Sequence, residues 1–356
     1  MSQNILITGG SGYLGGTVLA RWTEAGLLEH GKLFSLVRTD SQAEATRQLY
    51  GAEPLRIDLE DEDAVKNTIV SNKITIVLYL IDAYYLKNQI AFIRALAETK
   101  KQIGQDAHFI YTTGTKQFSS LSGSPIDRDL VDNEPHLFDI HKAQNAPHEE
   151  LQTATDTNIA VVEAGIEHGV KIYVFSPCIV YGKGEGFGNK ISIQTVDVVI
   201  AATAAGRMYE FDQKGQIWPV SHVLDTVSLY FTLLDAILKN KNPGHGKNGF
   251  YLASSGKVAW HDIYAGIAKG LARRGKIPDE RIELMNDTAL EKIAKAQKVS
   301  PSSVIVKIGG RSTYTAANGK SLGWMPQYPP EHILESLDKE VEIILEELDS
   351  RHQGTR

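Results

Sequence analysis

The sequence predicts an α/β protein built on a doubly wound parallel sheet, with a smaller C-terminal lobe. Two observations carry this prediction. Through the first half of the chain, short apolar runs alternate with segments at helical spacing, which is typical of a parallel sheet covered by helices on both faces. After Tyr181 a glycine-rich patch leads to longer helical segments separated by turns such as Asn242-Pro243-Gly244, which indicates a second lobe.

Six apolar runs are the candidate strands of this sheet: Asn4–Thr8, Leu33–Val37, Leu55–Ile57, Ile74–Ile81, His108–Thr112 and Lys171–Phe175. We expect a first helix over Thr17–Leu28 and another that carries an apolar stripe from Leu86 to Ala97. The polar stretch Ser119–Pro147 has no clear period, and we expect a long loop there that could cover a substrate. The last helix, from about Pro330, has an apolar seam that we expect in the core, with a homodimer contact as the alternative.

Composition excludes several classes of partner. At 356 residues, 42% hydrophobic and 22% charged, the chain can bury one large core or two modest ones. A net charge of -6 offers no broad basic surface, so we expect no nucleic-acid partner. The longest apolar stretch, Ile74–Ile81, is far shorter than the roughly 20 residues that cross a bilayer, so we expect no membrane contact. The single cysteine, Cys178, and the absence of a leader pattern before Asn4 predict a cytoplasmic protein.

A phosphate-binding loop follows the first strand. The run Thr8-Gly9-Gly10-Ser11-Gly12-Tyr13-Leu14-Gly15 lies between a strand and a helix. Gly9 allows a tight turn, Gly12 lets the backbone approach a pyrophosphate, and Gly15 permits close packing of the helix on the strand. The helix N-terminus directs N–H groups at the anion. The pattern is that of a Rossmann domain that binds a dinucleotide, and the predicted contacts in the loop are Gly9, Ser11, Gly12, Tyr13 and Leu14.

The glycine run resembles the TGxxGxxG signature of the extended short-chain dehydrogenase/reductases, the NAD-dependent epimerase/dehydratase family. Other segments resemble landmarks of that family in the same order: Asp58-Leu59, Tyr111-Thr112-Thr113-Gly114, Pro177-Cys178-Ile179-Val180-Tyr181-Gly182 and Leu322-Gly323-Trp324-Met325-Pro326. The resemblance covers nearly the whole chain. It implies further contacts to the cofactor from Asp58, Leu59, Leu80, Thr112, Pro177 and Ile179.

The end of the second strand indicates which dinucleotide is bound. An NAD-binding domain usually has Asp or Glu there for the ribose hydroxyls, whereas an Arg accommodates a 2′-phosphate. Here the strand ends in Leu36-Val37-Arg38, and the guanidinium of Arg38 suits a phosphate. We therefore expect NADP, with a surface ion pair between Arg38 and Asp40 as the alternative explanation.

On this reasoning the chain has two parts. Residues 1–181, together with about 220–250, are expected to form the NADP-binding Rossmann domain. Residues 182–219 and 251–356 are expected to form a smaller lobe that binds a small-molecule substrate.

The catalytic pair that the resemblance implies, a Tyr followed four residues later by a Lys, is absent. None of the 14 tyrosines has Lys at the fourth following position, and the pair would fall near Glu150 and Ala154. Other proton donors are therefore candidates. Tyr84 and Tyr85 follow the fourth strand, and Thr113 and Lys116 follow the fifth; in open α/β sheets, ligands bind outside such carboxyl ends. We expect the acid to be Tyr84 or Tyr85, with Thr113 orienting the reacting oxygen and Lys116 as a further candidate.

Several other residues are weaker candidates. His141 and Lys142 lie in the expected loop, His222 is expected to make a structural hydrogen bond, and Cys178 is expected to fill the core. No pair of histidines has the helical spacing of a zinc motif, so we expect no metal.

The function that these patterns favour is an NADP-dependent oxidoreductase of small organic metabolites. Two alternatives stay open: a non-catalytic NADP-binding redox sensor, and an isomerase or cyclase that retains the cofactor.

Overall fold

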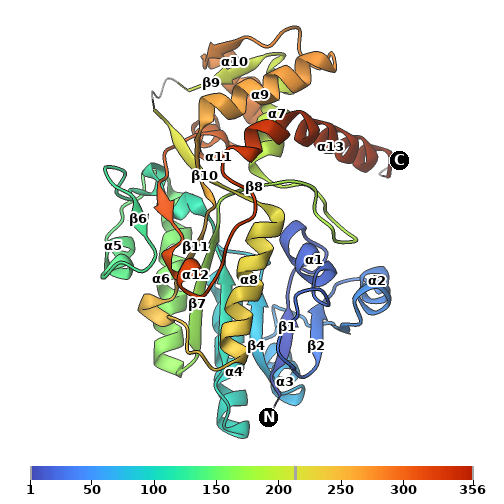
Figure 1. Ribbon diagram of the computed structural model, residues 1–356, viewed down its shortest axis with the longest axis vertical. Helices are drawn as coiled ribbons and strands as arrows, with labels where there is room; N and C mark the ends of the chain where they lie inside the picture. The colour runs from blue at the N-terminus through green and yellow to red at the C-terminus, as the bar shows by residue number, and fades with distance from the viewer. Residues whose placement is uncertain (1, 212–214, 355–356) are drawn as a thin grey trace.

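The computed structural model describes residues 2–211 and 215–354. Its centre is a seven-stranded sheet in the order β11-β7-β5-β4-β1-β2-β3, and every neighbouring pair is parallel (Figure 1). The strands are β1 (Asn4–Ile7), β2 (Leu33–Leu36), β3 (Glu53–Leu55), β4 (Ile74–Tyr79), β5 (His108–Thr112), β7 (Lys171–Pro177) and β11 (Phe250–Ala253). The predicted doubly wound parallel sheet is confirmed.

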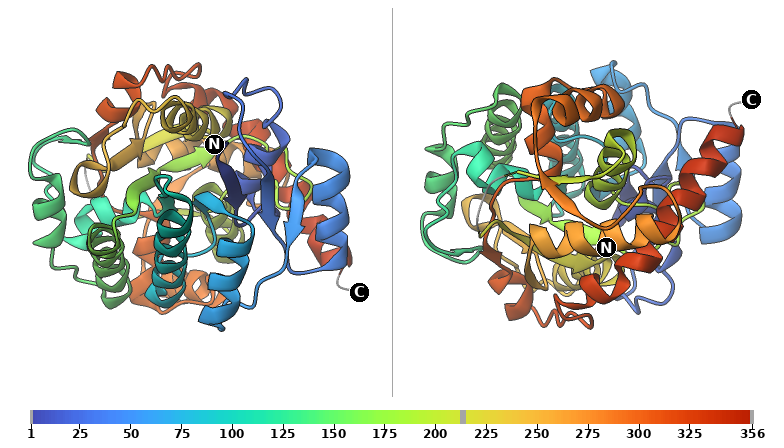
Figure 2. Two further views of the ribbon diagram at one scale, coloured as in Figure 1. Left: turned by 90° about the horizontal axis from the view of Figure 1, so that it is seen from below. Right: turned by 90° about the horizontal axis from the view of Figure 1, so that it is seen from above.

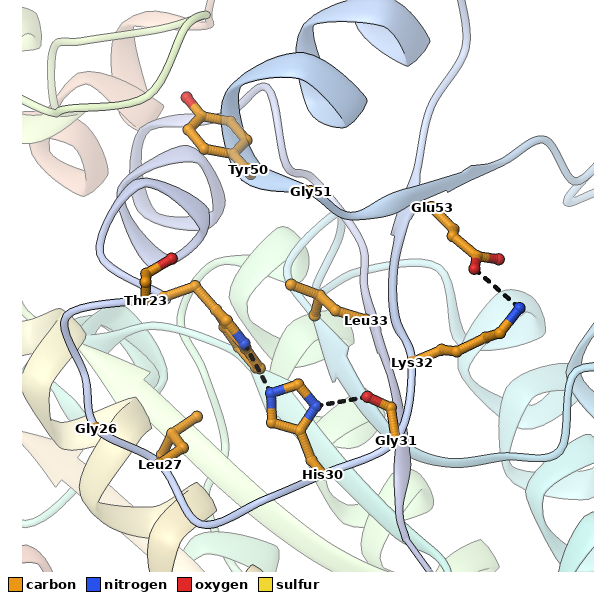
Figure 3. Close-up of a pocket in the computed structure, with 11 residues that line it drawn as sticks. Thr23, Gly26, Leu27, His30, Gly31, Lys32, Leu33, Tyr50, Gly51 and Glu53 are labelled. Carbon is orange, nitrogen blue, oxygen red and sulfur yellow. Dashed lines mark hydrogen bonds and ion pairs between the residues drawn. The ribbon is translucent and has the colours of Figure 1, made fainter.

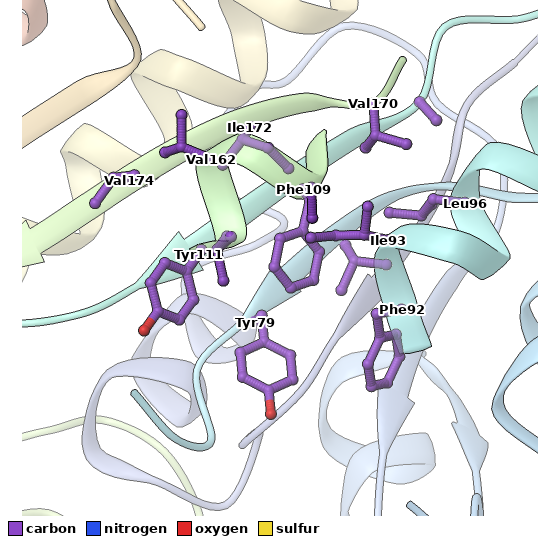
Figure 4. Packing of buried hydrophobic residues seen from close by; sticks show 14 of the residues in the cluster. Tyr79, Phe92, Ile93, Leu96, Phe109, Tyr111, Val162, Val170, Ile172 and Val174 are labelled. Carbon is purple, nitrogen blue, oxygen red and sulfur yellow. The ribbon is translucent and has the colours of Figure 1, made fainter. Parts of the chain in front are cut away.

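Helices cover both faces of the sheet (Figure 2). On one face lie α3 (Glu62–Ser71), α4 (Leu86–Ile103) and α6 (Glu149–His168). On the other lie α1 (Tyr13–Ala20) and α8 (Val223–Leu238). Figure 4 shows the first of these cores, in which rings of Tyr79, Phe92 and Phe109 pack between β4, β5 and α4. The strands are apolar on both faces because both faces are buried.

Several predicted elements have other bounds than expected; β3, for example, is Glu53–Leu55, whereas the apolar run predicted Leu55–Ile57. The first helix is α1, which begins at Tyr13 directly after the glycine loop and ends at Ala20, so its prediction over Thr17–Leu28 is wrong. The chain leaves it through turns, and Gly26 has a φ of 58°, a left-handed conformation that ends helical winding. β4 ends at Tyr79 rather than Ile81 because the Asp82 carboxylate accepts the backbone N–H groups of Tyr84 and Tyr85 in a turn.

Ser119–Pro147 is not the structureless loop that its polar composition suggested. It contains β6 (Leu130–Val131) and α5 (Leu137–Lys142), and β6 pairs with β14 (Tyr314–Thr315) near the end of the chain. Leu137 and Phe138 are buried in the core that lies against α6. The prediction fails because the polar side chains of this stretch make buried hydrogen bonds to one another, which a search for apolar periodicity cannot detect.

A second core lies beyond the carboxyl ends of the strands (top of Figure 1). A small sheet of β8 (Ile179–Tyr181), β10 (Ile217–His222) and β12 (Gly256–Ala259) supports it. Around it pack a strand pair and several helices: β9 (Met208–Glu210), β13 (Ile282–Leu284), α7 (Gln194–Ala205), α9 (Trp260–Arg273), α10 (Asp287–Gln297), α11 (Val304–Ile308) and α13 (His332–Gly354). The seam of α13 faces this core, where Leu337, Val341 and Ile344 are buried. None of the helices formed by the described residues has the length and apolar character needed to span a membrane.

Candidate cofactor and active site

The carboxyl edge of the sheet brings the phosphate-binding loop next to β4. Gly9 has a φ of 69°, and a Cβ atom there would lie 2.8 Å from the carbonyl oxygen of Leu80. Leu80 in turn donates its N–H to the hydroxyl of Thr8 at 2.8 Å. Gly9 therefore lies in a tight turn that has no room for a side chain, because the loop packs against the end of β4.

The loop leads directly into the N-terminus of α1. Gly12 precedes the helix and donates its N–H to the carbonyl oxygen of Gly9 at 2.8 Å. A Cβ on Gly15 would collide with that same carbonyl group, so helix and loop pack as closely as a glycine allows. Free N–H groups at such a helix start attract anions. Ser11, in the middle of the loop, accepts a hydrogen bond from the Gln42 side chain at 3.3 Å.

Arg38 lies just beyond β2 with an exposed side chain. Its backbone N–H donates to Gln42 at 2.8 Å, and no ion pair joins its guanidinium to another described residue. Asp40 instead pairs with Arg56, so the alternative explanation of Arg38 as the ion-pair partner of Asp40 is wrong. The guanidinium of Arg38 is therefore open to a ligand.

The other residues predicted to contact the cofactor differ in their exposure and in their hydrogen bonds. Asp58 is exposed beyond β3, and Leu59 packs against the core. The hydroxyl of Thr112 pairs with that of Tyr230 at 2.7 Å. Pro177 ends β7 and accepts a hydrogen bond from Thr115 through its carbonyl oxygen. Ile179 is fully buried in the second core.

The two candidate tyrosines differ in their surroundings. Tyr85 is 73% exposed, whereas Tyr84 is 41% exposed and its carbonyl oxygen accepts a hydrogen bond from Thr157 of α6. Burial raises the pKa of the Tyr84 phenol, and the Glu150 and Asp82 carboxylates add to that increase. The Tyr84 hydroxyl therefore stays protonated at neutral pH and is a weak acid.

Thr113 lies at the start of a buried chain of hydrogen bonds. Its hydroxyl donates to Asn158 Oδ1 at 2.8 Å, and the Asn158 amide lies 3.0 Å from His141 Nε2. His141 Nδ1 lies 2.5 Å from Gln144 Oε1, and its ring stacks on Phe118 with centroids 4.5 Å apart. The acceptor and donor roles agree along the chain if His141 is neutral and carries its proton on Nδ1.

The setting of His141 removes it from the candidate proton donors. Burial lowers its pKa to about 4, and both ring nitrogens are occupied. Asn158, by contrast, was missed by sequence reasoning. It follows Ala154 by one helical turn on α6, so the helical spacing that located Glu150 and Ala154 was the signal that could have found it.

Lys116 lies in a short 3₁₀ helix (Thr115–Phe118) that follows β5. Its side chain is half-buried, and among the residues that the structure describes it has no ion-pair partner. Burial lowers its pKa to about 8 against the opposing effect of the Asp197 carboxylate, and the Lys307 ammonium lowers it further. Since Asp197 and Lys307 belong to α7 and α11, the second core supplies charges to this site.

Asp197 and Lys307 were not predicted as site residues. The Lys307 ammonium lies 3.2 Å from the Asp197 carboxylate, which is largely buried. Burial raises the pKa of Asp197, while Lys307 and Lys116 oppose that shift. The charge of Lys116 therefore acts on a carboxylate that already has Lys307 as its ion-pair partner.

The remaining candidates have structural partners. Lys142 pairs with Glu163 at 2.6 Å, and His222 accepts the N–H of Leu224 at the start of α8. Cys178 is buried with its sulfur 3.0 Å from the Ala253 carbonyl oxygen, and burial raises the pKa of its thiol. Within residues 2–211 and 215–354, no group of three or more His, Cys, Asp or Glu side chains is placed to hold a metal ion.

A cavity of about 460 Å³ lies elsewhere (Figure 3). Its lining includes Leu33 and Glu53, which begin β2 and β3, so it lies at the amino ends of these strands. The Trp22 indole lies 3.0 Å from His30 Nε2, and His30 Nδ1 lies 2.8 Å from the Gly31 carbonyl oxygen. These polar groups are already paired, and the cavity is at the wrong edge of the sheet for the candidate site.

The parallel sheet, the glycine loop before α1 and the second lobe define a Rossmann-type α/β protein. Residues 5–246 match the NAD dependent epimerase/dehydratase family, and the chain belongs to that family. The predicted resemblance is therefore confirmed. The sequence has no match among curated proteins.

Solved structures with similar folds cover nearly the whole chain. UDP-glucose 4-epimerase from Thermotoga maritima, solved with UDP-glucose, has a TM-score of 0.62 at 16% identity, covering 97% of this chain and 100% of its own. dTDP-glucose 4,6-dehydratase from Bacillus anthracis, in complex with NAD, has a TM-score of 0.62 at 11% identity, covering 96% of each chain. Vestitone reductase from alfalfa has a TM-score of 0.59 at 16% identity, covering 97% and 99%. At these identities the likeness concerns the fold.

Proposed function

We propose that the protein is an NADP-dependent oxidoreductase that reduces a small organic carbonyl compound or oxidises the corresponding alcohol. The observation that carries the proposal is the half-buried Lys116 ammonium, which has no ion-pair partner among the described residues and lies beyond β5 where the second core meets the sheet. Membership of the epimerase/dehydratase family supports a nicotinamide cofactor, as do relatives solved with NAD.

The residues at the carboxyl edge fit a dinucleotide. Gly9 and Gly12 keep side chains out of the loop, and the N–H groups of Tyr13 and Leu14 at the start of α1 would bind the pyrophosphate. Arg38, whose guanidinium is free, would bind the 2′-phosphate of NADP. When bound, the dinucleotide supplies or accepts the hydride.

Lys116 is our proposed proton donor in the direction of reduction. With its pKa lowered to about 8, it is mostly protonated at neutral pH and still acidic enough to release the proton. The proton leaves Nζ for the substrate oxygen, and the reverse direction returns it. Tyr84, whose pKa is raised, is a weaker acid, and Tyr85 is largely exposed to water. These differences favour Lys116 over the two tyrosines.

Thr113 orients the reacting oxygen in this proposal. Because its hydroxyl hydrogen is directed at Asn158, its oxygen is left with lone pairs that accept hydrogen bonds. A second hydroxyl of the substrate that donates to Thr113 would leave the hydrogen of the reacting hydroxyl available to Lys116. The hydroxyl of Thr113 therefore suits a substrate that carries a further hydroxyl group next to the reacting carbon.

The test is oxidation of NADPH by the purified full chain with a panel of aldehydes and ketones, followed by absorbance. We expect turnover with at least one class of carbonyl compound, and a loss of turnover in Lys116→Ala while NADPH still binds. Lys142→Ala, which removes an exposed lysine from α5, is the matched control. Turnover that is equal in wild type and Lys116→Ala would refute the role of Lys116. NADPH binding without turnover across the panel would favour the redox-sensor alternative.

A further inference from the structure

The glycine-rich segment Gly182–Lys190, which we call the strap, lies directly on the phosphate-binding loop. Asn189 donates its backbone N–H to the carbonyl oxygen of Ser11 at 2.9 Å. A Cβ on Gly186 would lie 2.6 Å from Gly16 Cα, and one on Gly188 would collide with Ser11. The strap is rich in glycine because its backbone touches the backbone of the loop and of α1.

Side chains fasten the strap along its length. Glu185 forms an ion pair with Arg21, which directly follows α1, and its backbone N–H donates to the hydroxyl of Thr17 in α1 at 3.1 Å. Farther along, Phe187 donates its backbone N–H to the Tyr50 hydroxyl at 3.0 Å. These contacts tie the strap to α1 and to α2 (Asp40–Tyr50), which are the helices that flank the proposed cofactor site.

The strap begins at a buried carboxylate on the C-terminal helix. Glu340 of α13 is 3% exposed, and its Oε2 accepts the backbone N–H of Gly182 at 2.9 Å. Its Oε1 accepts the hydroxyl of Thr195 at 3.0 Å. Glutamates are rarely buried this fully unless their oxygens are paired. Both Glu340 oxygens are paired here, one of them to the first residue of the strap.

The same residue, Gly182, also contacts the phosphate-binding loop through its carbonyl group. The Tyr13 hydroxyl donates to the carbonyl oxygen of Gly182 at 2.6 Å. Gly182 is therefore held between Glu340 of α13 and Tyr13, the first residue of α1. In Figure 1, α13 lies above α1.

We propose that Glu340 is a positioning residue for the dinucleotide: through Gly182 and the strap it holds the phosphate-binding loop where its N–H groups can meet a pyrophosphate. The inference rests on the proposed cofactor site. Leu80, which directly follows β4, supports the loop on its inner side, and the strap supports it on its outer side. Without the strap, Ser11, Tyr13 and Gly16 would lose that outer support.

The test compares binding of NADPH with binding of adenosine 2′-monophosphate, which carries the Arg38 ligand but no pyrophosphate. Glu340→Ala is expected to weaken NADPH binding about tenfold, the effect of losing a hydrogen bond to a charged group. It should change the affinity for adenosine 2′-monophosphate less than about twofold. Glu340→Gln keeps one acceptor oxygen and should restore part of the NADPH affinity. Glu335→Ala, an exposed glutamate of the same helix, is the matched control.

Gly186→Ala gives an independent arm that leaves Glu340 in place, because its methyl group would push the strap away from Gly16. It should reproduce the selective loss of NADPH affinity, and it serves if Glu340→Ala does not fold by circular dichroism. Unchanged NADPH affinity in the folded variants, or an equal loss for both ligands, would overturn the inference. A wild type that binds neither ligand would overturn the proposed function itself.

Discussion

Thr113, directly after β5, donates a hydrogen bond to Asn158 in the middle of α6, with the hydroxyl oxygen 2.8 Å from the amide oxygen. On the face of α6 where the family's catalytic Tyr and Lys would lie, the residue that contacts Thr113 is therefore a neutral amide. The Asn158 amide is hydrogen-bonded to His141, which is hydrogen-bonded to Gln144. A chain of buried hydrogen bonds therefore lies behind the candidate site.

The first prediction is that Thr113 and Asn158 are energetically coupled. Asn158→Ala leaves His141 without its amide partner in the interior and should lower the free energy of unfolding by about 1–3 kcal/mol. Thr113→Val removes only the hydroxyl. In urea titrations, the double variant should lose less free energy of unfolding than the sum of the two single losses, by at least about 0.5 kcal/mol. Strict additivity would show that the contact contributes nothing.

Stability against acid should depend on His141. Burial lowers its pKa to about 4 in the folded protein, whereas the ordinary value of 6.5 applies to the unfolded chain. Between these two pH values the unfolded chain therefore binds a proton that the folded protein does not. Stability therefore falls as pH decreases through that window, by about 3 kcal/mol at 1.36 kcal/mol per pKa unit. Urea midpoints measured at several pH values for wild type and His141→Gln test this. The variant should show a shallower decline, and identical slopes would contradict the prediction.

The contrast between the sheet and its surroundings shows what the sequence could predict. Strands such as Ile74–Tyr79 are fully buried, so a continuous apolar run identifies them without knowledge of their neighbours. The glycine loop is equally local, because its turn, its close backbone approach and its helix start occupy consecutive residues. Fold class and family followed from such local patterns.

The candidate active site depends instead on long-range contacts. Asp197 and Lys307 lie far from Lys116 in sequence, and neither has a spacing that marks it as a site residue. From the sequence alone, the glycine-rich patch that includes Gly184, Gly186 and Gly188 indicates only the start of a second lobe. Their physical reason is contact with Gly16, Ser11 and Tyr13, which becomes visible only after folding.

Arg38 is expected to set the preference for NADPH over NADH. Its guanidinium is exposed and unpaired among the described residues, so a 2′-phosphate would meet no competing carboxylate on it. Arg38→Ala should weaken NADPH binding by roughly 1.5–3 kcal/mol and leave NADH nearly unchanged. Calorimetric titration with both cofactors measures this, and Arg47→Ala, an exposed arginine of α2, is the control. Equal affinities of the wild type for the two cofactors would contradict the prediction.

Gly12→Val should abolish dinucleotide binding without unfolding the protein. A Cβ at this position meets Gly9 O at 3.0 Å and otherwise points away from the protein, so the fold tolerates it better than the ligand does. The branched side chain would occupy the space of the pyrophosphate. Thr23→Val places the same side chain on the exposed segment after α1 and should bind normally. A folded Gly12→Val protein that still binds NADPH would rule out the assigned loop.

The last prediction is that Lys116 sets the pH dependence of turnover. Its ammonium must be protonated to donate in the direction of reduction, and with a pKa of about 8 it loses that proton as the pH rises. For the carbonyl substrate once found, kcat/KM for reduction should therefore fall above about pH 8, while alcohol oxidation should rise over the same range. Lys116→Ala should lower the rate about 10²- to 10⁴-fold and remove this inflection. Tyr84→Phe keeps the ring, removes the weaker acid and should leave both rate and inflection intact. If Tyr84→Phe abolishes the inflection while Lys116→Ala retains it, the proton comes from the tyrosine, and the charges that α7 and α11 bring to the site serve only to hold the lobes together.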